Sequence, residues 1–347
     1  MKAIWELEKI VSKLSLEEKE LFHRFYTYYV EEGRLVLPES LKNWAYQKFG
    51  ENCENQKIVR IINNFTFEST LFNELRAKRP IDVKESEDIK KIVEDTKGDA
   101  FCNPLEKTPS DPFGRIEGKH CITASNIAKY DYIHAVIVFK NHDPYSFSEE
   151  EVLDYFDVAE RWFLKAHEVY PDAIYPFFMW NCLWKAGASI VHGHAQALIS
   201  KIPYGKWMFY KQIRDNYEQM FDSEYLLDLY KVHELIGLGL TKDGIMFFAH
   251  LTPVKEKEVI LIGESFKDLA WCVSRVLQAY YELGVRSFNV AGFLPELGTK
   301  DWVFVKIVDR GDPGARTVDI GGMELYSGTS VVASDPFRVF EFISSRL

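Results

Sequence analysis

Three polar side chains occupy alternate positions near the middle of the sequence, in the stretch KAGASIVHGHAQALIS. They are His192, His194 and Gln196, and only Gly193 and Ala195 separate them. A neutral imidazole can attack phosphorus if one ring nitrogen keeps its proton for a fixed acceptor and the other keeps a free lone pair. These residues are therefore candidates for nucleophilic chemistry at a phosphate.

The loop before the histidines adds a second signal. Gly187 and Ser189 lie in the AGAS segment, where backbone N–H groups and a hydroxyl can hold phosphate oxygens. A His-x-His pair is nevertheless more often a pair of metal ligands or a surface coincidence than a nucleophile. The residues alone leave catalysis and metal binding open.

The segment that carries these residues, 190–200, reads as a β-strand. Alternate side chains of a strand lie on one face, so the two histidines and the glutamine are predicted to project together. The small residues between them, with Ala197, leave an almost flat opposite face against which a helix can pack. We predict that this helix spans 149–168, because Ser148 opens a capping box there and apolar residues follow at helical spacing.

Strand and helix patterns continue to the end of the chain. HCITASNI, HAVIVFKNH and AIYPFFMWNC read as strands, and GIMFFAHLTP, KEVILIG, RSFNVAGF and WVFVKIVD repeat a similar order around a helix. We therefore predict an α+β fold, with 70–205 as a first half that carries the motif and 206–347 as a second, degenerate half. Residues 1–69 read as a helical N-terminal extension, because apolar residues such as Ile4 and Leu7 recur at helical spacing.

The composition excludes several classes of protein. The chain has 347 residues, of which 47% are hydrophobic, and a net charge of −10. Nucleic-acid binding needs a basic stripe, so no nucleic-acid partner is expected. No apolar run approaches membrane-spanning length, and the start of the chain, MKAIWELEKIVSKL, has no signal-peptide core. Five scattered cysteines fit reduced thiols, and we expect a cytoplasmic protein without a membrane partner.

The order Gly-x-Ser-x-x-His-x-His-x-Gln resembles the motif of the histidine-triad superfamily, in the branch of galactose-1-phosphate uridylyltransferase, ADP-glucose phosphorylase and diadenosine tetraphosphate phosphorylase. Gly187, Ser189, His192, His194 and Gln196 fit this motif at every step. The resemblance covers the first half well and the remainder loosely. It implies antiparallel histidine-triad-like sheets with packed helices, two such halves in one chain, and a homodimer.

The same resemblance implies residues that bind the nucleotide and the acceptor. LFNELRAKRP resembles a segment whose arginines approach the nucleotide phosphates, here Arg76 and Arg79. TASNIAKY resembles the strand whose asparagine reaches the nucleoside, here Asn126, and Asn181 matches a second asparagine of the transferases. VDIGGMELY resembles the segment that holds the acceptor sugar phosphate, with Glu324 as its glutamate.

The resemblance further implies a two-step reaction. His194 attacks the α-phosphorus of a nucleotide sugar or a dinucleoside polyphosphate, a covalent nucleotidyl-His194 forms, and a phosphate-bearing acceptor then takes the nucleotide. Gln196 hydrogen-bonds the phosphoryl oxygen, at the position where the hydrolases of the superfamily have a third histidine. Because glutamine cannot deliver a proton, transfer or phosphorolysis is favoured over hydrolysis.

A structural zinc site is also implied by the resemblance. Asp99, Cys102, His142 and His192 match its four ligands, except that Asp99 replaces the first cysteine of a Cys-x-x-Cys pair. Aspartate, cysteine and histidine can all bind zinc. The alternative is that the chain binds no metal and that His142 braces a loop.

Two departures from the family pattern concern the substrate. Ile127 stands where the uridylyltransferases usually have aspartate, and Val318 stands where they have the lysine of the sugar-phosphate segment. These changes argue against galactose 1-phosphate as the acceptor, and the residues do not identify the donor base. The alternatives to a nucleotidyltransferase are a nucleotide hydrolase on the same scaffold and a catalytically idle protein that binds nucleotide or zinc.

Overall fold

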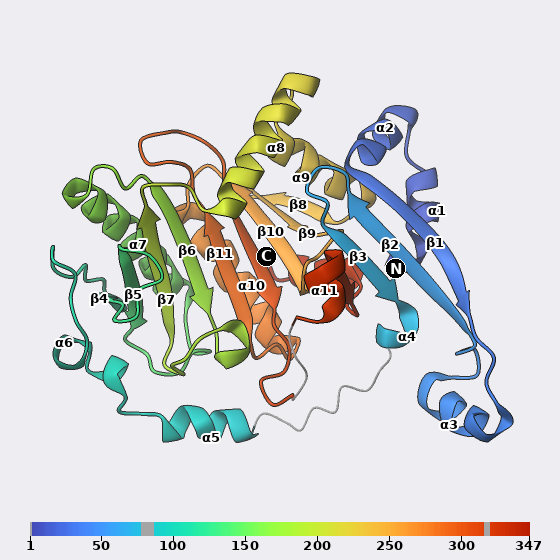
Figure 1. The fold of residues 1–347 in the computed structure, drawn as a ribbon, viewed down its shortest axis with the longest axis horizontal. Coiled ribbons are helices and arrows are strands. Elements are labelled where there is room, and N and C mark those ends of the chain that lie inside the picture. The colour runs from blue at the N-terminus through green and yellow to red at the C-terminus, as the bar shows by residue number, and fades with distance from the viewer. Residues whose placement is uncertain (1, 78–86, 316–319) are drawn as a thin grey trace.

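A nine-stranded antiparallel sheet forms the centre of the molecule (Figure 1). The structure is a computed structural model that describes residues 2–77, 87–315 and 320–347. The strand order of the large sheet is β4-β5-β7-β6-β11-β12-β10-β9-β8, and a separate four-stranded sheet has the order β1-β2-β3-β13. The predicted α+β class, with antiparallel sheets and packed helices, is confirmed.

Four strands of the large sheet surround the motif: β4 (Cys121–Ser125), β5 (His134–Phe139), β6 (Tyr175–Asn181) and β7 (His194–Ser200). The helix α7 (Glu149–Val169) packs against β4, β5 and β7. It begins with the predicted capping box, in which Ser148 and Glu151 each accept a hydrogen bond from the other's backbone N–H. Ala195 and Ala197 are fully buried in the core that includes α7, as the prediction of a flat face requires.

The remaining strands extend the same sheet: β8 (Gly239–Lys242), β9 (Ile245–Ala249), β10 (Glu256–Gly263), β11 (Phe288–Phe293) and β12 (Val303–Asp309). Because β11 pairs with β6, the two groups of strands form one sheet. The helical segments among them are α8 (Gly205–Phe221), α9 (Tyr225–Ile236), η4 (Lys267–Leu269) and α10 (Ala270–Glu282). The helix α10 packs against α7, and α12 (Pro336–Ser344) packs against α10, β9 and β10, so these three helices cover one face of the sheet (Figure 1).

The N-terminal segment contains strands as well as helices, so the prediction that 1–69 is helical is wrong in part. Its elements are η1 (Ile4–Glu6), α1 (Leu7–Ser12), α2 (Leu16–Phe25), β1 (Tyr26–Arg34), α3 (Glu39–Phe49) and β2 (Asn55–Asn63), followed by β3 (Ser69–Asn73) and α4 (Glu74–Ala77). β1 pairs with β2 along its whole length. The aromatic and β-branched residues that open β1 favour this extended pairing over a longer helix.

Short segments connect these parts: α5 (Glu87–Asp95), η2 (Ala100–Cys102), α6 (Pro104–Lys107), η3 (Trp184–Ala186), α11 (Gly322–Ser327) and β13 (Thr329–Val332). β13 pairs with β3 in parallel and so brings the C-terminal part of the chain to the N-terminal sheet. Within the described ranges, no helix is long and apolar enough to cross a membrane. The division of the chain at 69/70 and 205/206 stays a prediction, as do the two histidine-triad-like halves.

Candidate active site and metal site

The chain enters β7 through a tight passage at Gly193. The N–H of Gly193 donates to the carbonyl oxygen of His142 at 3.2 Å, and its own carbonyl oxygen accepts from the N–H of Phe139 at 3.1 Å. A Cβ atom on Gly193 would lie 2.8 Å from Cδ2 of Phe139, which explains the glycine. The predicted start of the strand at residue 190 is wrong, because the ladder of β7 begins at His194.

One ring nitrogen of His194 is bonded to the backbone. Nδ1 is 2.8 Å from the carbonyl oxygen of His192, and because a carbonyl can only accept, Nδ1 carries the proton. No described residue forms a hydrogen bond with Nε2. Burial lowers the pKa of His194, and the residue is 6% exposed. The ring is therefore neutral at neutral pH, with its lone pair on Nε2.

Gln196 lies on the same face of β7 and is held by a second histidine. Its Oε1 is 2.9 Å from Nε2 of His134, the first residue of β5. The backbone N–H of Tyr130 donates to Nδ1 of His134 at 3.1 Å, so the proton of this ring lies on Nε2 and is donated to Gln196. The sequence did not mark His134 as a site residue, because its partner lies on another strand and no local motif includes both.

Four side chains with metal-binding atoms converge beside the start of β7. The ligand atoms of Asp99, Cys102, His142 and His192 all lie within 4.8 Å of one another. The Sγ of Cys102 is 3.4 Å from Nδ1 of His142 and 3.6 Å from Nδ1 of His192. The two Nδ1 atoms are 3.0 Å apart, and Oδ1 of Asp99 is 3.3 Å from that of His192. Tetrahedral metal bonds of ~2.0–2.3 Å place ligand atoms about 3.3–3.6 Å apart, so the four residues fit a metal ion.

The outer contacts of these residues direct their ligand atoms inward. Nε2 of His142 donates to the carbonyl oxygen of Val93, and Nε2 of His192 donates to that of Phe139, both at 2.8 Å. Both Nδ1 atoms therefore carry lone pairs, which repel each other at this separation unless a cation lies between them. Oδ2 of Asp99 is buried and has no hydrogen-bond partner among the described residues. The predicted ligands thus form a candidate metal site.

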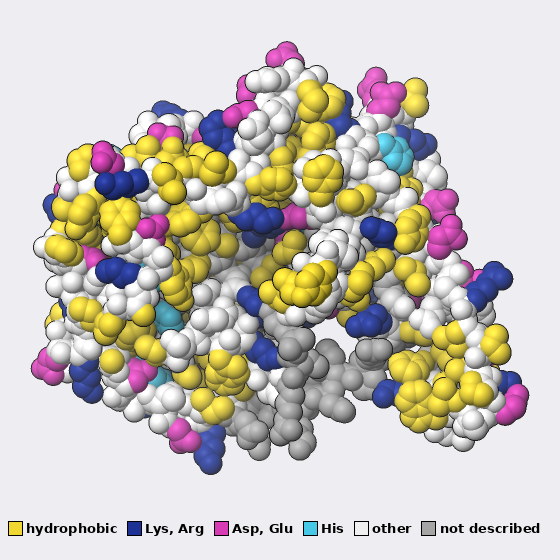
Figure 2. Space-filling model, viewed as in Figure 1, with side chains coloured by type: hydrophobic (Ala, Val, Ile, Leu, Met, Phe, Trp, Pro, Cys, Tyr) yellow, Lys and Arg dark blue, Asp and Glu magenta, His cyan; other side chains and the backbone are white. Residues whose placement is uncertain are grey.

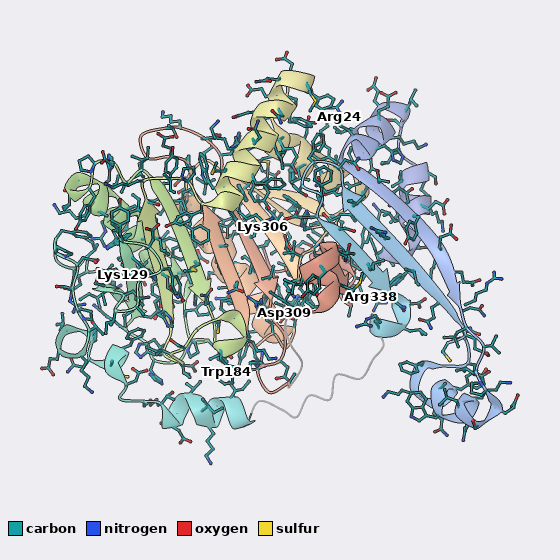
Figure 3. All side chains as sticks on the ribbon, in the orientation of Figure 1. Arg24, Lys129, Trp184, Lys306, Asp309 and Arg338 are labelled. Carbon is teal, nitrogen blue, oxygen red and sulfur yellow. The ribbon has the colours of Figure 1, made fainter. Side chains whose placement is uncertain are left out.

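The loop from β6 to β7 was predicted to hold phosphate. It turns sharply at Leu183, with φ of 62°, and at Gly187, with φ of 94°, a conformation that glycine adopts readily. Nε1 of Trp184 donates to the carbonyl oxygen of Pro313 at 3.0 Å, which ties the loop to the segment after β12 (Figure 3). Ser189 is exposed and makes no hydrogen bond with the described residues, so its hydroxyl and N–H are accessible to a ligand.

A chain of polar side chains crosses the sheet beside the start of β7. Because Met179 lies opposite Gln196 in antiparallel register, Asn181 lies level with the start of β7. Oδ1 of Asn181 accepts from Nδ2 of Asn289 on β11 at 2.6 Å, and the guanidinium of Arg310 donates to Oδ1 of Asn289. Arg310 thus extends positive charge toward this region. Figure 2 shows several Lys and Arg side chains near the middle of the face drawn there. No local motif marks Asn289 or Arg310 in the sequence.

The loop after β4 brings Asn126 beside the same residues. The amide nitrogen of Asn126 is 3.3 Å from Nε2 of His134. Lys129 holds this loop in place (Figure 3), because its Nζ donates to Oγ of Ser125 at 2.7 Å and to the carbonyl oxygen of His134 at 2.9 Å. The nucleoside contact of Asn126 stays a prediction.

Other predicted binding residues lie elsewhere in this chain. Arg76 is exposed on α4, and Glu324 lies on α11 with Nζ of Lys255 at 3.5 Å. Figure 1 shows α4 and α11 beside the four-stranded sheet, away from β7. Arg79 lies outside the described residues. The structure therefore does not bring these residues to His194 within one chain.

Comparisons with known proteins identify the fold. No protein-family model matches the chain, and no curated protein matches its sequence. The chain is similar to the structure of an ADP-glucose phosphorylase from Arabidopsis thaliana with bound ADP-glucose, at 14% identity and a TM-score of 0.60, over 79% of this chain and 94% of that one. It is similar to a GALT-like protein of the same plant, at 13% identity and a TM-score of 0.55, over 69% of this chain and 92% of that one. A uridylyltransferase structure matches at 16% identity and a TM-score of 0.56, over 69% of this chain and 88% of that one. The chain therefore has the fold shared by the ADP-glucose phosphorylase and uridylyltransferase structures, as the motif predicted.

Proposed function

We propose that this chain is a nucleotidyltransferase that acts through a covalent intermediate on Nε2 of His194. The donor is a nucleotide sugar or a dinucleoside polyphosphate, and the acceptor carries a phosphate. The observation that carries the proposal is the 2.8 Å hydrogen bond from Nδ1 of His194 to the carbonyl oxygen of His192. It fixes the tautomer in which Nε2 is a nucleophile.

The reaction has two displacements at the same phosphorus. In the first, Nε2 of His194 attacks the α-phosphorus, an N–P bond forms, and the P–O bond to the leaving phosphate breaks. The amide nitrogen of Gln196 donates to a phosphoryl oxygen, and the N–H and hydroxyl of Ser189, in the turn that Gly187 makes, donate to another. In the second, an acceptor phosphate oxygen attacks, the N–P bond breaks, and the neutral imidazole is regenerated.

A nucleotide hydrolase on the same scaffold is the second candidate. A leaving group that is unstable as an anion must be protonated as it departs, and Gln196 cannot provide that proton. A phosphate leaves as an anion without such help. The amide at this position therefore supports transfer or phosphorolysis. The Nε2 of His194, which has no hydrogen-bond partner among the described residues, argues against a catalytically idle binding protein.

We also propose that Asp99, Cys102, His142 and His192 hold zinc. Four ligands from the protein are typical of a structural zinc site, whereas a catalytic site keeps one position open. The backbone carbonyl of His192 accepts the proton of His194. A metal bound at the His192 ring therefore holds the peptide that sets the tautomer of the nucleophile, without contact with the substrate.

Product analysis tests the proposed function. Purified protein is incubated with ADP-glucose, UDP-glucose or diadenosine tetraphosphate, with and without inorganic phosphate or a sugar 1-phosphate. We expect turnover only when an acceptor is present, and none in His194→Ala. Release of free mononucleotide without an acceptor would show the hydrolase, and ligand binding without turnover would show an idle protein.

A homodimer is part of the proposal. Arg76 and Glu324 lie on elements away from β7 in this chain, so a second copy is needed if they are to contact the same substrate. Light scattering after size exclusion is expected to give about twice the chain mass of 40.4 kDa. A fully active monomer at assay concentration would contradict this part of the proposal.

A further inference from the structure

We infer that His134 is a positioning residue, which fixes the side-chain amide of Gln196 so that its N–H₂ group faces the substrate phosphate. This inference rests on the proposed function, because it assigns a task to Gln196 in the transfer step. Both residues are buried, with exposed fractions of 0% for His134 and 4% for Gln196. Water therefore does not compete for the hydrogen bond between them.

The direction of each hydrogen bond follows from the backbone. The N–H of Tyr130 can only donate, and it lies 3.1 Å from Nδ1 of His134. Nδ1 must therefore be unprotonated, and the ring proton must lie on Nε2. Since Nε2 is 2.9 Å from Oε1 of Gln196, the imidazole donates and the carbonyl oxygen of the amide accepts. The amide nitrogen of Asn126, 3.3 Å from the same Nε2, is also a donor and therefore makes no hydrogen bond with it.

This bond selects one of two amide orientations. A glutamine amide turned by 180° would place its nitrogen against the N–H of His134 and its carbonyl oxygen toward the substrate. That state loses a hydrogen bond inside the protein and sets oxygen against phosphoryl oxygen, which is repulsive. The His134 bond removes this state before the substrate arrives, so the donor is preorganised for the charge that develops on the phosphoryl oxygen.

The loop that contains Tyr130 is itself held in place. Nζ of Lys129 donates both to Oγ of Ser125 and to the carbonyl oxygen of His134. The ring of Tyr130 lies over the imidazole, with centroids 4.8 Å apart. The imidazole of His134 is thus held by a hydrogen bond from a backbone N–H and by contact with the Tyr130 ring, as a positioning residue must be.

A second pair in the same sheet uses the same strand positions. Glu258 on β10 contacts Lys306 on β12 at 2.9 Å, as His134 on β5 contacts Gln196 on β7. In both pairs, the first residue lies two positions before the residue that pairs directly with the second. Glu258 lies where the register of β10 and β12 shifts between Glu256 and Val259, so the two pairs share the offset along the sequence and not the local backbone geometry.

Three variants test the inference through the rate of nucleotidyl transfer to His194. His134→Phe keeps a ring but removes the donor, and we expect the first step and kcat to fall about tenfold to a hundredfold, with little change in the donor KM. His134→Gln can place an amide N–H near the position of Nε2, and it should restore much of the loss. His23→Phe is the control, because His23 is exposed on α2, and it should stay within about twofold of the wild type.

The outcomes separate this inference from the proposed function. If the wild type is nucleotidylated and folded His134→Phe is nucleotidylated at the same rate, His134 is not a positioning residue. If the wild type is never nucleotidylated, the proposed function fails. In that case ¹⁵N NMR of the histidine rings still decides the inferred geometry. Protonated Nε2 and unprotonated Nδ1 in His134 would support the inference, and the opposite tautomer would overturn it.

Discussion

His192 and His194 are two residues apart and have different roles. The ring of His192 turns its Nδ1 toward the candidate metal site, whereas its backbone carbonyl accepts the proton of His194. The metal ligand and the nucleophile are thus joined through one peptide group. Loss of the metal is expected to disturb the nucleophile even though the two rings do different chemistry.

Removal of one metal ligand is the first prediction. His142→Ala should abolish stoichiometric zinc, because three ligands from the chain bind it much more weakly, and should lower the melting temperature by a few degrees or more. Elemental analysis and thermal unfolding measure both effects. The matched control is His23→Ala, since His23 is exposed on α2 and should leave the metal in place. Wild-type zinc content in the His142 variant would contradict the assignment.

At the level of single residues, the sequence was informative where a motif is local. His194, Gln196 and the four candidate metal ligands were found through spacing and resemblance, and the structure brings the four ligands together. His134, Asn289 and Arg310 were missed. Their roles depend on which strands become neighbours, and a pattern within one strand contains no information about that.

At the level of elements, the passage into β7 depends on the absence of a side chain at Gly193. We predict that Gly193→Ala lowers the free energy of unfolding by about 1–3 kcal/mol and reduces turnover, because its Cβ would lie 2.8 Å from Cδ2 of Phe139 and 3.4 Å from Cα of Pro144. Urea denaturation and the transfer assay measure these effects. Gly205→Ala is the control, since nothing lies within 4 Å of its added Cβ. Equal effects of the two substitutions would contradict the steric argument.

The helices and strands near the motif were largely predictable, and the N-terminal strands were not. The capping box at Ser148 and the apolar spacing after it correctly located α7. β1 was missed because it follows α2 directly, at Tyr26, without glycine or proline to mark the change. Its partner β2 follows only after α3, so no short hairpin signal was present.

At the level of the whole molecule, a buried ionic cluster joins the large sheet to the N-terminal sheet. Nζ of Lys306 is 2.9 Å from Glu258 and 3.3 Å from Glu68, which lies between β2 and β3, and it donates to the hydroxyl of Tyr210 on α8 at 3.1 Å. Figure 3 shows Lys306 near the centre of the sheet. Burial of so many charged groups is tolerated because each has a partner.

Removal of the central cation should destabilise the whole fold. Lys306→Met removes the buried cation between Glu258 and Glu68, which keep only His250 and the more exposed Lys206 as contacts. We expect the free energy of unfolding to fall by about 3–5 kcal/mol. Lys211→Met is the control, because the pair of Lys211 with Asp215 is about half exposed and should contribute less than about 1 kcal/mol. Chemical denaturation of both variants decides the point. A loss at Lys306 no greater than that at Lys211 would refute a structural role for the cluster.

The same cluster predicts how stability depends on pH. Burial alone would raise the pKa of Glu258, but Lys306 and His250 hold it at about 2. The folded-state pKa is below the unfolded value of about 4.3, so this contribution is present above that pH and is lost as the pH falls toward 2. Denaturation between pH 6 and pH 3 should show a steeper loss for the wild type than for Glu258→Gln. Parallel curves for the two proteins would contradict the assignment.

The arrangement of the sheets relative to each other was beyond sequence reasoning. The contact of Glu68 with Lys306 joins positions that are 238 residues apart, and β13 adds a strand to the N-terminal sheet from near the other end of the chain. Local periodicity does not specify such contacts. The α+β class could be predicted from the order of helices and strands along the sequence, but the packing of the two sheets could not.

The most direct test of the central claim is the site of covalent labelling. The protein is incubated with each candidate donor in the absence of acceptor and digested, and the peptide that contains His194 is examined by mass spectrometry. We expect an acid-labile mass increase of one nucleotidyl group on His194, which an added acceptor removes and His194→Ala lacks. The proposal is contradicted if His194 stays unlabelled with a donor that the same preparation turns over once acceptor is added, or if another residue is labelled.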